Sequence, residues 1–182
     1  MDTLDRRPFA DAVASSLLFP KKLEPHLEQA LRHVLSHPGT LLRPRIVFEM
    51  ALGYGLEAAT AQDLAVALEY FHTASLIFDD LPCVDNALER RGAPCVHGAF
   101  GEATAMLAAL ALINRGYALA WRSVAGTPQE RQSRVLAYIE SRLGVDGLLN
   151  GQSLDLLPPS LYGSIACSNK LNIPTADPLY RR

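Results

Sequence analysis

The chain has 182 residues, about half of them hydrophobic and a fifth charged, and its formal net charge is −2. This length fits one domain with a single core, and without a basic excess we expect no nucleic-acid partner. The longest purely apolar run, "MLAALALI" at 106–113, is too short to span a bilayer, so we expect no transmembrane segment.

Apolar residues recur with helical spacing along most of the chain, and no stretch alternates as a convincing strand. In "KKLEPHLEQALRHVLSH", for example, leucines follow one another every four residues until Pro38-Gly39 ends the pattern. The expected helices cover residues 21–37, 43–55, 60–80, 102–124, 127–143 and 145–157. The predicted fold class is therefore all-α.

Local signals mark some helix ends and contacts. Thr60 is expected to cap the helix at 60–80, with Asp63 at the capping-box position. Pro128 is expected at the first position of the helix that follows it. The Ala-rich helix at 102–124 carries small residues, which permit a close approach of a neighbouring helix.

The helical pattern fades after Pro158-Pro159, so we expect a helical bundle over residues 1–157 and an irregular tail over 158–182. The helical stretches 64–78 and 103–113 are apolar almost all round and should be buried on several sides. Six helices leave such surface partly uncovered, and exposed apolar patches favour association. We therefore expect a homo-oligomer, a dimer or larger.

The cysteines favour a reducing compartment. Cys83, Cys95 and Cys167 are an odd number and form no C-x-x-C pair. A reduced, cytoplasmic protein is the simpler interpretation than a disulfide framework or a zinc site. Cys83 and Cys95 are expected to be packing residues. The polar, acidic start "MDTLDRRPF" predicts no secretory signal.

Three acids gather in "SLIFDDLPCVDNALERRG", residues 75–92. Asp79 and Asp80 end a helix, where the helix dipole disfavours negative charge, so a cation is needed to offset them. Pro82 breaks the helix, and a turn brings Asp85 back toward Asp79. Carboxylates grouped in this way suit Mg²⁺, which bridges them to substrate phosphates.

Two basic residues follow this acidic stretch directly. His72 lies seven residues before Asp79, on the same face of the expected helix. The guanidinium groups of Arg90 and Arg91 match phosphate oxygens in geometry. The alternative is that the acid pair is only a helix end and the arginines a solvated pair. Their joint occurrence behind an apolar helix favours a diphosphate site.

The motif "HTASLIFDDLPCVDNALERRG" closely resembles the first aspartate-rich region of the trans-isoprenyl diphosphate synthases, the farnesyl and geranylgeranyl diphosphate synthase family. The spacing D-D-x-x-x-x-D with Leu-Pro-Cys inside is similar to the bacterial and plant type. The resemblance continues through "CVHGAFGEATAMLAALALI" to "GQSLDL" and covers roughly residues 35–157. It implies the N-terminal half of an isoprenoid synthase bundle, incomplete at its C-terminus.

This resemblance implies a Mg²⁺-dependent prenyltransferase. The allylic diphosphate ionises, isopentenyl diphosphate attacks the allylic cation through its double bond, and a proton is lost. The roles implied are metal binding by Asp79 and Asp85 with Asp80 in support, allylic diphosphate binding by Arg90, and isopentenyl diphosphate binding by Arg91, His72 and Arg43.

The resemblance also bears on the reacting end of the substrate. Gln152 and Asp155 match the family's G-Q-x-x-D, in which the Gln lies near the reacting allylic group. The positions four and five before the first aspartate form the floor of the product tunnel in the family. Here these are Ser75 and Ala74, whose small side chains favour geranylgeranyl over farnesyl diphosphate as the product.

Two features depart from the family pattern. The family's G-G-K-R-x-R-P corresponds to "PGTLLRP", in which Thr40 and Leu41 replace the Lys and Arg. Loss of one charge-assisted contact to isopentenyl diphosphate costs about 1.5–3 kcal/mol. The family's second aspartate-rich motif, and the Lys-Thr pair before it, have no counterpart after residue 157.

Three interpretations remain open at this point. The chain is a truncated form of an isoprenoid prenyltransferase, a non-catalytic regulatory or binding subunit of a prenyl synthase, or a helical bundle that binds Mg²⁺ or diphosphate without turnover. The intact D-D-x-x-x-x-D and R-R favour the first, because a purely structural subunit has no need of them.

Overall fold

The computed structural model describes residues 7–156, and the chain divides into two compact units, Met1–Pro128 and Gln129–Arg182. The first unit comprises α1 (Arg7–Ser16), α2 (Pro25–Ser36), α3 (Leu42–Gly53), α4 (Ala58–Asp79), β1 (Glu89–Arg90), β2 (Ala93–Pro94), α5 (Val96–Phe100) and α6 (Glu102–Val124). The second comprises α7 (Gln129–Leu143) and α8 (Leu148–Asp155). The described part is thus helical apart from one short hairpin, and the all-α prediction is confirmed.

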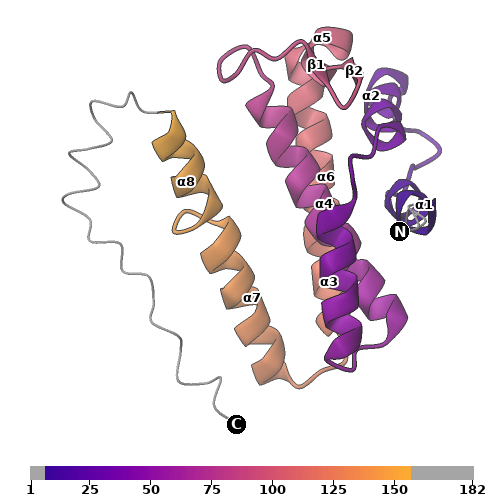
Figure 1. The fold of residues 1–182 in the computed structure, drawn as a ribbon, viewed down its shortest axis with the longest axis vertical. Coiled ribbons are helices and arrows are strands. Elements are labelled where there is room, and N and C mark those ends of the chain that lie inside the picture. The colour runs from indigo at the N-terminus through magenta and orange to yellow at the C-terminus, as the bar shows by residue number, and fades with distance from the viewer. Residues whose placement is uncertain (1–6, 157–182) are drawn as a thin grey trace, which may run out of the picture. The chain divides into compact units, whose positions relative to one another are not determined.

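The core of the first unit is the long contact between α4 and α6, which run side by side in Figure 1. The helices approach closely because the contact is rich in small side chains. At Gly116 of α6, an added Cβ would lie 3.0 Å from the ring of Phe71 on α4. The predicted role of small residues in the Ala-rich helix is therefore confirmed.

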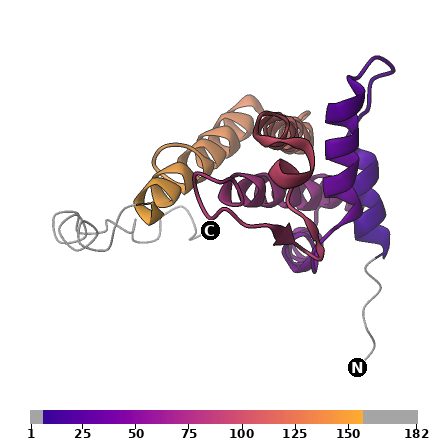
Figure 2. The same ribbon diagram turned by 90° about the horizontal axis from the view of Figure 1, so that it is seen from above.

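Around this pair, α3 packs against α4, and α1 and α2 lie together on one side of the first unit in both views (Figures 1 and 2). Helix α2 also contacts α5 and α6. The hairpin and α5 close the end of the unit at which α4 stops. This is the end that carries the acid and base cluster.

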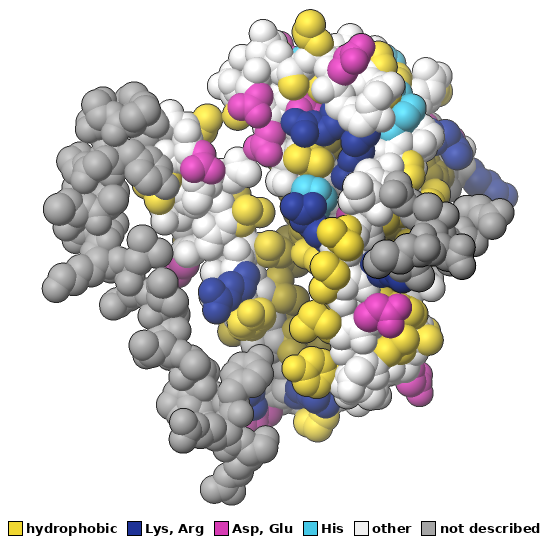
Figure 3. All heavy atoms as spheres, in the orientation of Figure 1, with side chains coloured by type: hydrophobic (Ala, Val, Ile, Leu, Met, Phe, Trp, Pro, Cys, Tyr) yellow, Lys and Arg dark blue, Asp and Glu magenta, His cyan; other side chains and the backbone are white. Residues whose placement is uncertain are grey.

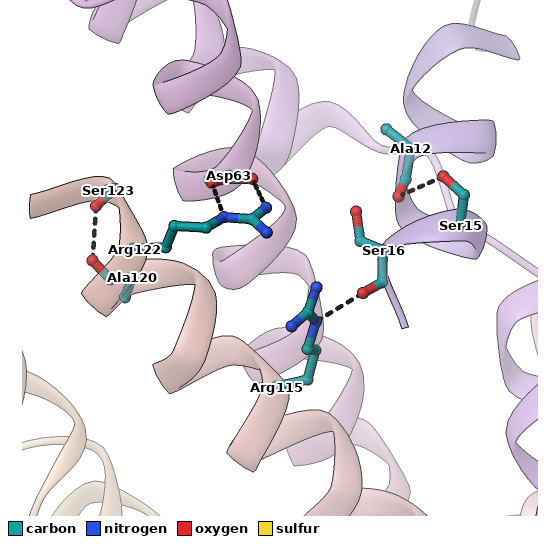
Figure 4. Close-up of polar contacts among 8 residues, drawn as sticks. All are labelled: Ala12, Ser15, Ser16, Asp63, Arg115, Ala120, Arg122 and Ser123. Atoms are coloured by element: carbon teal, nitrogen blue, oxygen red, sulfur yellow. Dashed lines mark hydrogen bonds and ion pairs between the residues drawn. The ribbon is translucent and has the colours of Figure 1, made fainter. Parts of the chain in front are cut away.

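Polar contacts tie the helices to one another. Arg122 of α6 donates from Nε to an oxygen of Asp63 on α4 at 2.6 Å, and Arg115 Nε donates to the carbonyl of Ser16 at 2.6 Å (Figure 4). The hydroxyl of Tyr70 donates to the carbonyl of Val13. The last two contacts satisfy carbonyls at the end of α1 that have no partner within the helix.

Each expected helix has a counterpart, but several starts differ. The first expected helix begins at Pro25, because the Glu24 carboxylate accepts the N–H groups of His26 and Leu27 at 3.0 and 2.8 Å. The prediction that Thr60 is an N-cap is wrong. Helix α4 begins at Ala58 with Glu57 as its N-cap residue.

The hairpin was not expected from the sequence. Its strands pair antiparallel with Arg90 opposite Ala93, so Arg91 and Gly92 form a two-residue turn. Both turn residues have positive φ, 56° and 79°, as a type I′ turn requires. Strands of two residues are too short to show the alternation that identifies a strand in a sequence.

Helix α6 bears on the membrane prediction. Among the described helices, it alone is long and apolar enough to cross a membrane by length and composition. This is a weak indication, because a core helix of a soluble protein meets the same criterion. Within the first unit it makes its longest contact with α4.

The predictions about the cysteines and about exposed apolar surface are confirmed in part. Cys95 is buried, as a packing residue should be, whereas Cys83 is exposed, and both are free thiols. Cys167 and the predicted tail at 158–182 lie outside the described residues. Helix α6 is only partly covered, as expected for a helix that is apolar almost all round. Its exposed large apolar side chains include Leu107, Leu110 and Trp121.

We expect Gly116→Val to destabilise the first unit by about 1–3 kcal/mol, because the new side chain must push into the ring of Phe71. Urea denaturation measures the change. Ala118→Val is the control: it places a valine at an exposed position of the same helix, where it costs about 0.5 kcal/mol of helix propensity, whereas replacing a glycine costs none. A loss of unfolding free energy in Gly116→Val no larger than that in the control would show that the α4–α6 contact accommodates the added side chain.

Candidate functional site

The acids stand where α4 ends. Asp79 is its last residue, and after a short turn the backbone N–H of Asp85 donates to the Asp79 carbonyl at 2.9 Å. This contact confirms that the chain returns Asp85 to Asp79. Asp79 is half-buried and Asp85 is exposed, so both lie at the mouth of the site rather than in its interior.

Asp80 lies differently, because it is only 4% exposed. Its two carboxylate oxygens accept hydrogen bonds from Nε of Arg90 at 2.8 and 2.9 Å. These bonds raise the pKa of Arg90. The cation that the end of α4 requires to offset its buried acid is therefore Arg90, contributed by strand β1.

Arg91 reaches back along α4 in the other direction. From the hairpin turn, its Nη2 donates to Oε1 of Glu69 at 3.2 Å, and its Nη1 donates to the carbonyl of His37 at 3.4 Å. The guanidinium also packs against Gly39, where an added Cβ would lie 2.8 Å from Arg91 Nε. Consecutive arginines are thus bound to two different carboxylates of α4.

Sequence analysis missed Glu69. Glu69 is 3% exposed, and Thr73, one helical turn on, donates to its carboxylate at 3.4 Å. Burial raises the pKa of Glu69, and the positive charges of Arg91 and Arg43 oppose that rise. The available signal was periodicity: Glu69, Thr73 and Asp80 lie on one face of α4, and they are its buried polar residues.

His72 stands among the basic groups. Burial, and then the positive charges of Arg43, Arg91 and Arg90, lower its pKa. The imidazole is therefore biased toward its neutral form, in which it can donate one hydrogen bond to an anion. Figure 3 shows the corresponding face of the first unit, where Lys and Arg side chains gather near a histidine above a run of hydrophobic side chains.

Arg43 comes to this cluster from the start of α3 and is exposed. The residue before α3, Leu41, is 5% exposed and has a φ of 54°. Leu41 therefore anchors the start of α3 by burial, and it offers no charge. Thr40 beside it is exposed and also uncharged.

A cavity of about 40 Å³ lies behind the arginines, between α2, α4 and the hairpin. Its lining includes Thr73, Asp80, Arg90 and Arg91, but neither Arg43 nor His72. That volume accommodates roughly one or two water molecules, not a diphosphate. An anion would therefore approach from the open side of the cluster.

The positions predicted to set chain length lie on different sides of α4. Ser75 is half-buried on the face of Asp79, and its hydroxyl donates to the carbonyl of His72 at 2.9 Å. Ala74 is 1% exposed and packs inside the bundle. Gln152 and Asp155 lie on α8, in the second unit.

The donor set bears on the predicted magnesium ion. Within the described residues, no group of three or more His, Cys, Asp or Glu side chains could hold a metal. Asp79 and Asp85, which a backbone hydrogen bond joins across one turn, are the two acids at the mouth of the site. Mg²⁺ binds in this way when waters and substrate phosphates complete its octahedron. The residues fit a magnesium ion shared with a diphosphate, and they do not form an all-protein cage.

Comparison with known proteins agrees with this chemistry. The family model described as polyprenyl synthetase matches residues 24–170. A geranylgeranyl diphosphate synthase from Pseudescherichia vulneris is 40% identical over 129 residues, which are 70% of this chain and 42% of the relative. A farnesyl diphosphate synthase from Bacillus subtilis is 36% identical over 131 residues, 71% of this chain and 44% of the relative.

Solved structures agree with the fold. An FPP/GFPP synthase from Zymomonas mobilis has a TM-score of 0.74 at 30% identity, over 82% of this chain and 54% of that one. A geranyltransferase from Helicobacter pylori, complexed with magnesium and isoprenyl diphosphate, has a TM-score of 0.68 at 28% identity, over 81% of this chain and 50% of that one. The chain spans less than half the length of the two curated relatives above.

We expect Asp80→Asn to lower the free energy of unfolding by about 1–3 kcal/mol, because it removes the charged partner of Arg90 from a pair whose acid is buried. Asp85→Asn should change it by less than about 0.5 kcal/mol, since that side chain is exposed. Urea denaturation of both variants checks this. Similar changes in unfolding free energy for the two variants would contradict our assignment of Asp80 as a structural acid and of Asp85 as an exposed one.

Proposed function

The chain belongs to the polyprenyl synthetase family, and from this membership we propose that it acts in Mg²⁺-dependent prenyl transfer. In this reaction, isopentenyl diphosphate is condensed with an allylic diphosphate to give geranylgeranyl or farnesyl diphosphate. The substrate class is supported by the diphosphate synthases among its relatives and by the isoprenyl diphosphate bound to the Helicobacter pylori enzyme.

One observation carries the proposal for this chain. A half-exposed acid pair and a cluster of basic groups occupy the same end of α4. Asp79 and Asp85 are joined across one turn, while His72 lies within the electrostatic reach of three arginines. Acids for a metal beside bases for a phosphate are what two diphosphate substrates require.

In the proposed site, Asp79 and Asp85 would hold Mg²⁺, and Asp80 would act through its bond to Arg90. Bound Mg²⁺ would supply charge stabilisation to the departing diphosphate. Arg90 would bind the allylic diphosphate. Arg91, Arg43 and His72 would bind isopentenyl diphosphate.

The chain's own residues would serve the chemistry mainly by electrostatics and by exclusion of water. As the carbon–oxygen bond of the allylic substrate breaks, guanidinium groups stabilise the charge that develops on the leaving diphosphate. The allylic cation needs an apolar surface free of water until the double bond of isopentenyl diphosphate attacks it and a proton leaves. The apolar faces of α4 and α6 would contribute that surface.

Product length is a finer part of the proposal. Ser75 shares the face of Asp79, so its small side chain leaves room below the diphosphate for a long prenyl chain. Ala74 is buried within the bundle, so its small side chain would affect product length indirectly, through how closely α4 packs against its neighbouring helices. Both positions favour geranylgeranyl over farnesyl diphosphate.

A non-catalytic regulatory or binding subunit of a prenyl synthase is the second candidate. The observation that favours it is the start of α3, where exposed Thr40 and buried Leu41 supply no charge to the isopentenyl diphosphate site. Such a subunit would bind diphosphate through Arg43 and Arg91 and complete no turnover.

The proposal includes a homo-oligomer and a cytoplasmic location. Exposed apolar side chains on α6 support association, among them Leu107, Leu110 and Trp121, because surface of this kind is usually covered. Light scattering at the protein concentration of the assay measures the assembly. A mass of one chain would contradict the oligomer.

The test of function is prenyl transfer by the purified chain with Mg²⁺, farnesyl diphosphate and labelled isopentenyl diphosphate. We expect labelled geranylgeranyl product from the wild type and at least about a hundredfold less from Asp79→Ala, which loses a metal-binding carboxylate. Removal of Mg²⁺ with EDTA should have the same effect. Binding of isopentenyl diphosphate without any product would favour the binding subunit instead.

A further inference from the structure

We propose that Glu69 is a positioning residue, which holds the guanidinium of Arg91 in the orientation that binds isopentenyl diphosphate. The inference rests on the proposed function, and it assigns a role to a residue outside the aspartate-rich motif.

Arg91 is held on three sides before any ligand arrives. Glu69 accepts from its Nη2 at 3.2 Å, and the carbonyl of His37 accepts from its Nη1 at 3.4 Å. Gly39 leaves the space in which the guanidinium lies. The Arg91 side chain is 19% exposed, so part of it remains accessible to an anion.

The backbone conformation alone does not fix the orientation of the Arg91 guanidinium. Arg91 occupies the first position of the hairpin turn with a φ of 56°, and the turn fixes only where its Cα stands. An arginine side chain has several rotatable bonds beyond that point and loses much freedom when it is held in one orientation. Glu69 is the acidic partner that selects one orientation, from a helix whose own place is fixed by the core.

The charge of Glu69 works against the ligand. A buried carboxylate near an anion site repels the anion, and burial already disfavours its ionised form. If charge alone mattered, neutralising Glu69 would tighten diphosphate binding. If orientation of Arg91 matters more, neutralising it weakens binding. The two effects have opposite signs, so the direction of change decides between them.

The experiment measures isopentenyl diphosphate binding to the full chain by isothermal titration calorimetry without Mg²⁺, so that the Asp79–Asp85 pair is not engaged. We expect about tenfold weaker binding for Glu69→Met, the scale of one misdirected charge-assisted hydrogen bond. Glu69→Gln, which keeps an acceptor, should lose less. Unchanged or tighter binding in both variants would overturn the proposal.

Two further variants separate position from charge. Gly39→Ala displaces the Arg91 guanidinium and leaves every charge in place, and we expect it to weaken binding by about tenfold as well. Asp63→Asn is the control: it removes the acidic partner of Arg122 from the same helix, away from the arginine pair, and should leave binding within about twofold. Circular dichroism confirms that each variant is folded.

A double-mutant cycle tests whether Glu69 acts through Arg91. In an Arg91→Lys background, which lacks the planar fork, we expect Glu69→Met to have less than about a twofold effect on binding. A full tenfold effect in that background would overturn the positioning role, because Glu69 would then act on the ligand by another route.

The side-chain NMR signal of Arg91 in the ligand-free chain separates this inference from the proposed function. We expect a shifted, ordered Nε–H signal in the wild type and its loss in Glu69→Met. If the wild type shows that order and binds no isopentenyl diphosphate, the proposed function fails, and the inference falls with it. If the wild type binds the ligand and the signal is the same in both, only the inference fails.

Discussion

The pairing of two buried carboxylates, one on α4 and one at its C-cap, with two consecutive arginines is the interaction on which the site depends. Asp80 and Glu69 lie about 16 Å apart along one helix face, and Arg90 and Arg91 extend in opposite directions to reach them. A hairpin with two-residue strands has almost no stability of its own. The hairpin is therefore positioned by these ion pairs, and each buried carboxylate is offset by a guanidinium.

Helix α4 joins the core and the site in one rigid element. One face packs against α6 through small residues such as Gly116, a second carries the buried acids, and a third presents His72 and Asp79 to the open side. Groups that share a packed helix keep their spacing better than groups on loops. Substitutions in the apolar contact can therefore displace the acids and bases without touching them.

The sequence predicted what local patterns encode and missed what distant contacts decide. Helical periodicity located the main helices, and the break at Pro82 predicted the return of Asp85 to Asp79. The hairpin was missed because its strands are two residues long. The partnership of Glu69 with Arg91 was missed because nothing local joins them, and Thr60 looked like a cap although α4 starts before it. The family resemblance supplied the roles at the site that spacing alone left open.

The crowding of guanidinium groups around His72 has a consequence for the life of the protein. Burial and these positive charges lower the pKa of His72, so its protonation is disfavoured while no anion is bound beside it. Under the proposed function, a diphosphate would bind among these groups in the folded chain alone, so at a hundred times its dissociation constant it would add about 2.7 kcal/mol to stability. Substrate supply would then regulate how much of the protein escapes proteolysis, and abundance would follow flux.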